Sequence, residues 1–195
     1  MILLIAVALG LVCGFLRAKI NRTKINPINL HWIGLVFIAY IPQFFAFSFY
    51  PTQRQMPDAW IPFILIGSQI LLLVFAWVNR KTPGFLLLGL GLLSNFLAIT
   101  LNGGFMPLPP ENAERLIAPG SGITLQAGDR AGLGKDIVLS RADTNLWFLG
   151  DIFMVPDRLD YPLAFSFGDI LIAMGAFWLL WELGRPQSQP KEVPP

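Results

Sequence analysis

Cysteine and histidine are almost missing from this 195-residue chain, which holds one of each, Cys13 and His31. A single cysteine excludes an intramolecular disulfide, and a single histidine excludes bis-histidine haem ligation and a histidine-rich metal site. We therefore expect no cofactor and no metal. Charged residues are also scarce, at 13% of the chain against roughly a quarter in an ordinary soluble domain. The net charge of only +2 gives no electrostatic footprint for a nucleic-acid partner.

Apolar residues are abundant, at 54% of the chain, with a mean hydropathy of +0.60. They form five long runs, at residues 2–16, 30–50, 60–78, 84–101 and 165–183. A helix needs about 20 residues to cross a bilayer, within a range of roughly 17–25, and the last four runs fit that length. The pattern predicts an all-α integral membrane protein, a five-helix transmembrane bundle in one domain over residues 1–184, with the lipid bilayer as its main partner.

The first run is short enough to be a cleaved signal peptide. A signal peptide carries its positive residues before the apolar core, whereas here Arg17, Lys19, Arg22 and Lys24 follow it. We therefore expect a retained helix with the N-terminus outside. Lys and Arg then recur in alternate gaps, which by the positive-inside rule places the C-terminus inside and the loop 102–164 outside. We expect the tail 185–195 to be a disordered cytoplasmic segment.

The loop 102–164 differs from the rest of the chain because it is polar and rich in turn residues. It holds eight acidic residues against five basic ones, which agrees with an outside location. Loops of this length are uncommon in compact proteins unless they are functional. Within it we expect a short helix at 111–117 and short strands at 123–126 and 137–139.

Asp169 is the most informative polar residue, because it lies about one turn inside the fifth apolar run. An ionisable group at that depth is costly and by default faces the bundle interior or a water-filled cavity. Ala173 and Ala176 share its face of the helix. The position is also close to a helix N-terminus, where the dipole favours a carboxylate. A ligand-binding or catalytic role and a structural cap or interhelical hydrogen bond both remain open.

Other polar residues fall in the outer halves of their runs. Gln43, Asn95 and Asn102 are expected to line, with Asp169, one polar pocket open to the outside. The alternative is interhelical hydrogen bonding, worth about 0.6 kcal/mol for each bond in a membrane bundle. Gly103 and Gly104 follow the fourth run, where they either cap the helix or let the backbone approach a ligand closely.

Two loop aspartates, Asp151 and Asp157, lie in a stretch that is apolar for an outside loop. If either meets Asp169 near the membrane surface, two close carboxylates push their pKa values apart, as in an aspartic dyad that activates water. The alternative is a lid packed on the bundle with solvated acids. The candidate binding residues are therefore Asp169, Asn95, Asn102, Gly103, Gly104, Gln43 and Asp151, and the alternative catalytic set is Asp151, Asp157 and Asp169.

Three strings in the second half of the chain, at 101–107, 144–152 and 165–172, give the chain a family resemblance. They read Leu-Asn-Gly-Gly-Phe-Met-Pro, Thr-x-Leu-x-x-Leu-Gly-Asp-Ile and Phe-Ser-x-Gly-Asp-Ile-Leu-Ile. In order and spacing they resemble DUF5317, a family of small bacterial membrane proteins of unknown function. The resemblance implies a multi-pass protein of the bacterial inner (plasma) membrane and supplies no activity.

A second likeness is local. Lipoprotein signal peptidase, an intramembrane aspartic peptidase, has an Asp-Arg-Leu string outside the membrane and a Phe-Asn-x-Ala-Asp string that opens its last helix. The strings at 157–159 and 165–169 are similar to these in order and predicted face. Ser166 stands where that family has Asn, and Gly168 where it has Ala.

No complete catalytic set is present in the sequence. The leading interpretation is therefore a non-enzymatic inner-membrane subunit or binding module, which docks a protein partner, a second copy, a lipid or a small molecule at the outer polar pocket. The alternatives are a membrane-embedded aspartic hydrolase and a small transporter. The absence of a visible repeat or a broken pair of helices argues against the transporter.

Overall fold

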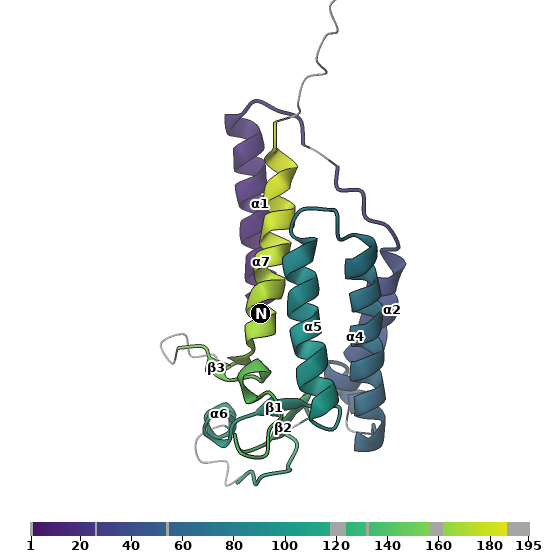
Figure 1. Cartoon of the computed structure of the whole chain (residues 1–195), viewed down its shortest axis with the longest axis vertical. Coiled ribbons are helices and arrows are strands. Elements are labelled where there is room, and N and C mark those ends of the chain that lie inside the picture. The colour runs from purple at the N-terminus through teal and green to yellow at the C-terminus, as the bar shows by residue number, and fades with distance from the viewer. Residues whose placement is uncertain are drawn as a thin grey trace, which may run out of the picture.

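The computed structural model describes residues 2–25, 27–53, 55–117, 124–131, 133–156 and 162–186. These residues form mainly helices, with a few short strands (Figure 1). The α-helices are α1 (Ile2–Ile20), α2 (Gly34–Phe47), α3 (Tyr50–Gln53), α4 (Ile61–Val78), α5 (Phe85–Leu101), α6 (Pro110–Leu116) and α7 (Phe167–Trp181).

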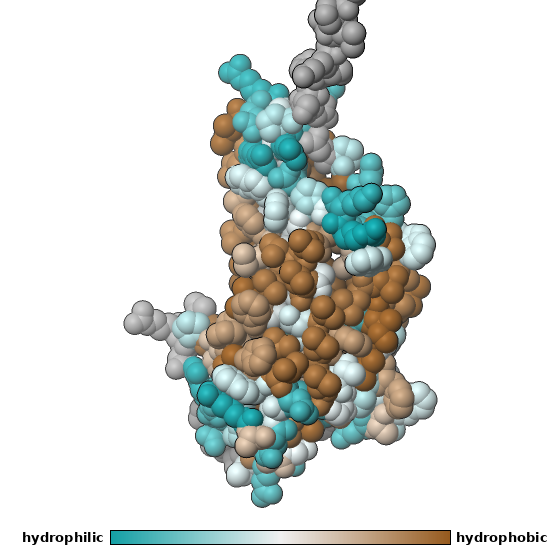
Figure 2. Space-filling view, viewed as in Figure 1, coloured by the Kyte–Doolittle hydropathy of each residue, from teal (hydrophilic) through white to brown (hydrophobic). Residues whose placement is uncertain are grey.

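The five long helices stand side by side in the spatial order α1, α7, α5, α4, α2 (Figure 1). Among the described residues, three helical segments are long and apolar enough to cross a membrane, namely Ile2–Ile20, Asp58–Val78 and Phe167–Gly184. The other two long helices, α2 and α5, are apolar but shorter. Figure 2 shows hydrophobic side chains covering the middle of the molecule and hydrophilic ones gathered towards both ends. This distribution is the one expected of a protein surrounded by lipid.

The second apolar run begins its helix later than the sequence suggested, at Gly34 rather than at residue 30. The preceding linker is fixed to the end of α4 by Asn79. Its Oδ1 accepts from His31 N at 2.8 Å, and its Nδ2 donates to the oxygens of His31 and Phe75, both at 2.9 Å. These side-chain bonds satisfy backbone groups that a helix would otherwise satisfy.

Glycines allow α5 and α7 to pack backbone against backbone. Gly84 lies opposite Gly175, and Gly91 lies opposite Gly168, so that both helices repeat glycine every seven residues along one antiparallel seam. A Cβ at Gly91 would lie 2.5 Å from the Gly168 oxygen, and one at Gly175 would lie 2.6 Å from the Gly84 oxygen. Side chains of any size would therefore force the two helices apart.

Helix α1 packs on the other side of α7, and the two helices run parallel. A Cβ at Gly10 would lie 3.1 Å from the Phe177 oxygen, and Gly14 faces the Leu180 backbone. At the end of this contact, Gly184 in the 3₁₀ segment η4 (Glu182–Gly184) would meet Ala18 N at 2.6 Å if it carried a Cβ. The Gly10-x-x-x-Gly14 spacing is thus a packing face, as such spacing is in membrane bundles.

The two halves of the helix row are staggered. Because Gly91 is opposite Gly168, the last nine residues of α5 extend past the start of α7. At the other end, Gly84 is opposite Gly175, so about nine residues after Gly175 extend past the start of α5 (Figure 1). At 1.5 Å per residue the offset is about 14 Å. It leaves a step beside the C-terminal half of α5.

The segment between α5 and α7 fills this step and is called the cap, residues 102–166 as far as they are described (Figure 1). Strand β1 (Met106–Leu108) pairs in parallel with β2 (Asp136–Val138), and β3 (Phe153–Met154) pairs antiparallel with β4 (Ala164–Phe165). Two 3₁₀ segments, η1 (Asp58–Trp60) before α4 and η2 (Trp147–Leu149) in the cap, complete the elements. Leu108, Ala113 and Val138 form a small core under α6.

The expected cap elements were right in part. Helix α6 covers residues 111–116 of the short helix expected at 111–117, and β2 covers residues 137–138 of the strand expected at 137–139. The strand expected at 123–126 is wrong for residues 124–126, which are irregular, while residue 123 lies outside the described residues. The partner of β2 is instead β1. Pro107 in its middle donates no backbone bond, but Met106 N and Leu139 N supply bonds on either side, to Lys135 O at 3.0 Å and Leu108 O at 3.1 Å.

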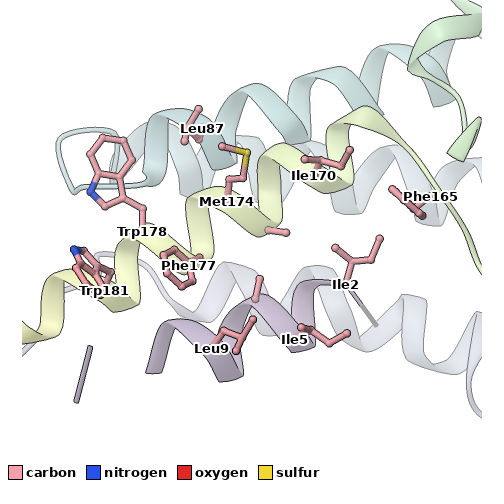
Figure 3. Close-up of a pocket in the computed structure, with 12 residues that line it drawn as sticks. Ile2, Ile5, Leu9, Leu87, Phe165, Ile170, Met174, Phe177, Trp178 and Trp181 are labelled. Atoms are coloured by element: carbon pink, nitrogen blue, oxygen red, sulfur yellow. The ribbon is translucent and has the colours of Figure 1, made fainter. Parts of the chain in front are cut away.

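An apolar trough of about 690 Å³ runs along α7 between α1 and α5 (Figure 3). Side chains of α1 form one wall and Leu87 of α5 stands on the other side, while Met174 and Ile170 rise from α7. Trp178 and Trp181 lie at the end of the trough towards the C-terminus of α7. All twelve residues that line it are apolar, so in a membrane the trough is a lipid-facing surface.

Candidate functional site

Asp169 and Asn95 join α7 to α5 by side-chain hydrogen bonds. Asn95 Nδ2 donates to Asp169 Oδ1 at 2.9 Å, and Ser166 Oγ donates to Asn95 Oδ1 at 2.9 Å. Ser166 also forms a reciprocal capping box with Asp169: its backbone N–H donates to Asp169 Oδ2 at 3.2 Å, and Asp169 N–H donates to Ser166 Oγ at 3.0 Å. Together these bonds link the three residues in a ring, which includes the backbone N–H groups of Ser166 and Asp169.

This ring uses both carboxylate oxygens of Asp169 and both polar atoms of the Asn95 amide. The structural alternatives foreseen for Asp169, a helix cap and an interhelical hydrogen bond, are therefore both present at once. Ser166 is fully buried and Asn95 nearly so. Gly168 is required beside them, because a Cβ there would collide with the Asn95 side chain.

Asn102 fixes the cap to the C-terminal end of α5. Its Nδ2 donates to Ala98 O at 2.7 Å and to Asn145 O at 2.9 Å, while its Oδ1 accepts from Asn145 N at 2.9 Å. Asn145 Nδ2 returns a bond to Leu101 O at 2.9 Å. The two asparagines thus hold together two segments that are 43 residues apart in the sequence. They also donate hydrogen bonds to backbone carbonyls at the end of α5, which have no partner within the helix.

Gly103 and Gly104 turn the chain out of α5 with positive φ angles of 72° and 85°. Gly104 N donates to Ile99 O at 2.9 Å, which caps the helix. A Cβ at Gly104 would collide with Pro62 at the start of α4, whereas one at Gly103 would meet nothing within 4 Å. The close approach that glycine permits here is to the neighbouring helix.

Asp151 and Lys135 form the charged centre of the cap. Lys135 Nζ donates to Asp151 Oδ2 at 2.6 Å and to Asp136 Oδ1 at 3.0 Å. The Asp151 side chain is 1% exposed and that of Lys135 is 39% exposed. Asp151 Oδ1 is buried without a hydrogen-bond partner. The backbone of Asp151 is held as well, by Pro107 O at 2.9 Å and by Asn112 Nδ2 at 3.0 Å.

Burial raises the pKa of Asp151 to about 7, because a charge is poorly solvated there. The ammonium of Lys135 opposes this rise, while the carboxylates of Asp136 and Asp169 add to it. Desolvation lowers the pKa of Lys135, but the three surrounding carboxylates outweigh it and raise that pKa above its ordinary value. Asp169 therefore interacts electrostatically with both members of the pair.

The three strings that carry the family resemblance meet at one place in space. The first touches the second through Asn102 with Asn145 and through Pro107 O with Asp151 N. The third reaches α5 through the bonds of Asp169 and Ser166 to Asn95. We call this group of contacts the joint, formed by Asn95, Asn102, Lys135, Asn145, Asp151, Ser166 and Asp169.

Not every candidate residue takes part in the joint. Gln43 lies half-buried on α2, a helix that contributes no residue to the joint. Asp157 lies outside the described residues.

In the part of the chain that the structure describes, no group of three or more His, Cys, Asp and Glu side chains is placed to hold a metal ion.

Sequence reasoning missed Lys135, Asn145 and Ser166. Ser166 had a local signal, since it stands three residues before Asp169 at the start of an apolar run, the spacing of a capping box. Lys135 and Asn145 had none, because the partners that tie them into the joint, Asp151 and Asn102, are 16 and 43 residues away.

Comparisons with known proteins agree with the resemblance. The profile of a family of unknown function, DUF5317, matches residues 27–181. An uncharacterized protein of Thermotoga maritima is 26% identical over 195 residues, covering 99% of this chain and 96% of its own length. No solved structure matches the chain. The family profile spans α2 to α7 together with the whole joint, and on this ground the chain belongs to the DUF5317 family.

Proposed function

We propose that the chain is a non-enzymatic, multi-pass protein of the bacterial inner membrane that docks a partner through its cap. In this proposal all five long helices cross the bilayer, with the N-terminus and the cap outside. The basic ends of α1, of the α4–α5 turn and of α7 support the sidedness, because Lys and Arg concentrate on the cytoplasmic side.

The single observation that carries the docking role is that the polar side chains of the joint bond to one another. Asp169 has both oxygens occupied and Asp151 holds Lys135 at 2.6 Å. Such a joint fixes the cap rigidly on the helices, and a rigid surface loses little conformational entropy when it binds a partner.

The face that the fixed cap presents carries apolar side chains. Trp147 and Phe148 pack edge to face with ring centroids 6.1 Å apart, and both remain 40% or more exposed. The Arg141 guanidinium lies 4.8 Å from the centre of the Trp147 ring. Aromatic residues and arginine are enriched in protein interfaces, so a protein partner, or a second copy of this chain, fits this face better than a small polar ligand does.

Co-purification from native membranes tests the proposal. We expect Phe148→Ala and Asp169→Asn to reduce recovery of a defined partner band, the first by removing contact area and the second by loosening the cap. Phe63→Ala, an equally apolar change at an exposed position on α4, serves as the matched control. Equal recovery from all three variants and the unaltered chain would refute docking through the cap.

An aspartic hydrolase is the second candidate, and the raised pKa of Asp151 beside Asp169 is the observation that favours it. A dyad needs a water between two carboxylates, whereas Lys135 already occupies Asp151 and Asn95 occupies Asp169. The geometry therefore supports docking better than hydrolysis.

A small transporter receives no support from the described helices, because α1, α4, α5 and α7 are continuous.

A further inference from the structure

Positive charge collects at the end of the molecule opposite the cap, called here the basic end. It lies at the C-termini of α1 and α7, in the linker after α1 and in the α4–α5 turn (Figure 1). Its cations are Arg17, Lys19, Arg22, Lys24, Arg80, Lys81 and Arg185. The one carboxylate among the described residues there, Glu182, pairs with Arg17 and Arg185.

An apolar groove of about 490 Å³ opens on the surface between α4 and α5, beginning at this end. Its floor is made of small or buried residues, Ala76 and Phe85 with Gly89 beside them. Exposed apolar side chains form its rim, namely Val74, Trp77, Leu86, Leu90 and Leu93. From Leu86 to Leu93 the groove extends about 11 Å along α5, at 1.5 Å per residue.

Arg80 stands at the mouth of the groove with much of its hydrogen-bonding capacity unused. One N–H, on Nη1, donates to Trp77 O at 2.9 Å, and the guanidinium lies 4.5 Å from the centre of the Trp77 ring. A guanidinium has five N–H donors. In the part of the chain that the structure describes, neither Arg80 nor the adjacent Lys81 has a carboxylate partner.

We propose that this groove binds one acyl chain of an anionic phospholipid, whose phosphate is held by Arg80 and Lys81. The charge is complementary, since Arg80 lines the groove at the level of a headgroup, with Lys81 next to it in the α4–α5 turn, and an apolar surface follows at the depth of the acyl chains. The length also fits, because about 11 Å lies within one leaflet of a hydrocarbon core that is about 30 Å thick. Arginine forms bidentate bonds to phosphate, and Lys81 adds a second charge.

This inference rests on the proposal that α4 and α5 lie in the membrane. It does not depend on the cap or on what docks there. It also assigns the lipid to the leaflet at the basic end, which is the cytoplasmic leaflet if the proposed sidedness holds.

Native mass spectrometry of the full chain, released from detergent with added lipid, tests the inference. The probes are phosphatidylglycerol and phosphatidylcholine with the same acyl chains. We expect one phosphatidylglycerol to be retained in preference to phosphatidylcholine. Arg80→Gln should weaken phosphatidylglycerol retention about tenfold, the effect of losing one hydrogen-bonded charge. Gly89→Leu should reduce retention of both lipids, because its side chain fills the groove while its Cβ makes only an ordinary 3.6 Å contact with Ala76.

Lys19→Gln is the matched control, since it removes one exposed cation from the same end but away from the groove. Retention unchanged by Lys19→Gln and lowered by Arg80→Gln supports the site. Equal losses in the two variants would mean diffuse attraction to the basic end and would overturn the proposal, as would equal retention of the two lipids by the unaltered chain. Partner recovery through the cap is a separate readout, so failure of either proposal is recognisable on its own.

Discussion

Lys135 Nζ lies 2.6 Å from Asp151 Oδ2, and this pair ties the residue before β2 to the segment that follows η2. The two members differ in their access to water, since Asp151 is 1% exposed and Lys135 is 39% exposed. The environment is therefore asymmetric, with a buried carboxylate neutralised by a cation that still reaches solvent. This asymmetry has a measurable consequence.

Removal of the cation should cost more than removal of the carboxylate. Lys135→Gln leaves the buried Asp151 without a counter-charge, and we expect a loss of about 3 kcal/mol, the lower end for a broken buried pair because Lys135 is partly hydrated. Asp151→Asn lets Lys135 turn to water and should cost about 1 kcal/mol. Thermal unfolding in detergent, with limited proteolysis of the cap, measures both. Equal losses would contradict the asymmetry.

Asp151 should also give the cap an unusual dependence on pH. Its pKa in the folded cap is about 7, above the ordinary 3.8 that it regains on unfolding. Between these values the folded cap keeps a proton that the unfolded chain has lost, so this group's contribution to stability falls as pH rises from about 4 to about 7. Comparing melting temperatures of the unaltered chain and Asp151→Asn across that window isolates the effect. Parallel curves would show that the pKa is not raised.

The glycine seam between α5 and α7 should tolerate no enlargement. Gly91→Ala places a Cβ 2.5 Å from the Gly168 oxygen, and we expect a loss of about 1–3 kcal/mol from overpacking. Gly67→Ala on α4 is the matched control, since its Cβ meets nothing within 4 Å. Alanine is the better helix former, so the control should be neutral or slightly stabilising. If both variants lost a similar amount of stability, the loss would come from the detergent environment rather than from the seam.

The bond between Asn95 and Asp169 should couple α5 to α7 in a measurable way. A double-mutant cycle with Asn95→Ala and Asp169→Ala should give a coupling energy of about 0.6–1.7 kcal/mol, the range found for side-chain bonds in membrane bundles. Ser94→Ala is the control, because the side chain of Ser94 donates to Leu90 O within its own helix. Additive losses from the two alanine changes would mean that the bond contributes nothing to stability.

The long helices were predictable from the sequence because apolar runs of this length are typical of membrane-spanning helices. Runs at 60–78 and 84–101 became α4 and α5 to within one residue. Strand β1 was not predictable, since Pro107 reads as the end of a helix rather than the middle of a strand. The position of Asp169 at a helix start was evident, but its bond to Asn95 spans 74 residues, and no local pattern encodes a contact of that range.

The relative heights of the helices were also beyond the sequence. Hydropathy gives the length of each run but does not determine how far one helix is shifted along its neighbour. The slide is set by where backbones come closest, at Gly84 with Gly175 and Gly91 with Gly168. Those four glycines share a spacing of seven, yet a chain with 18 glycines offers many such pairs.

The offset of about 14 Å between the α1–α7 pair and the other long helices bears on the surrounding bilayer. A flat membrane offers two parallel boundaries, and a molecule whose halves reach different heights cannot match both boundaries around its whole circumference. Neighbouring lipids must then tilt, or the sheet must thin or slope along one flank. If the long helices cross the bilayer as proposed, the chain would deform its host membrane locally.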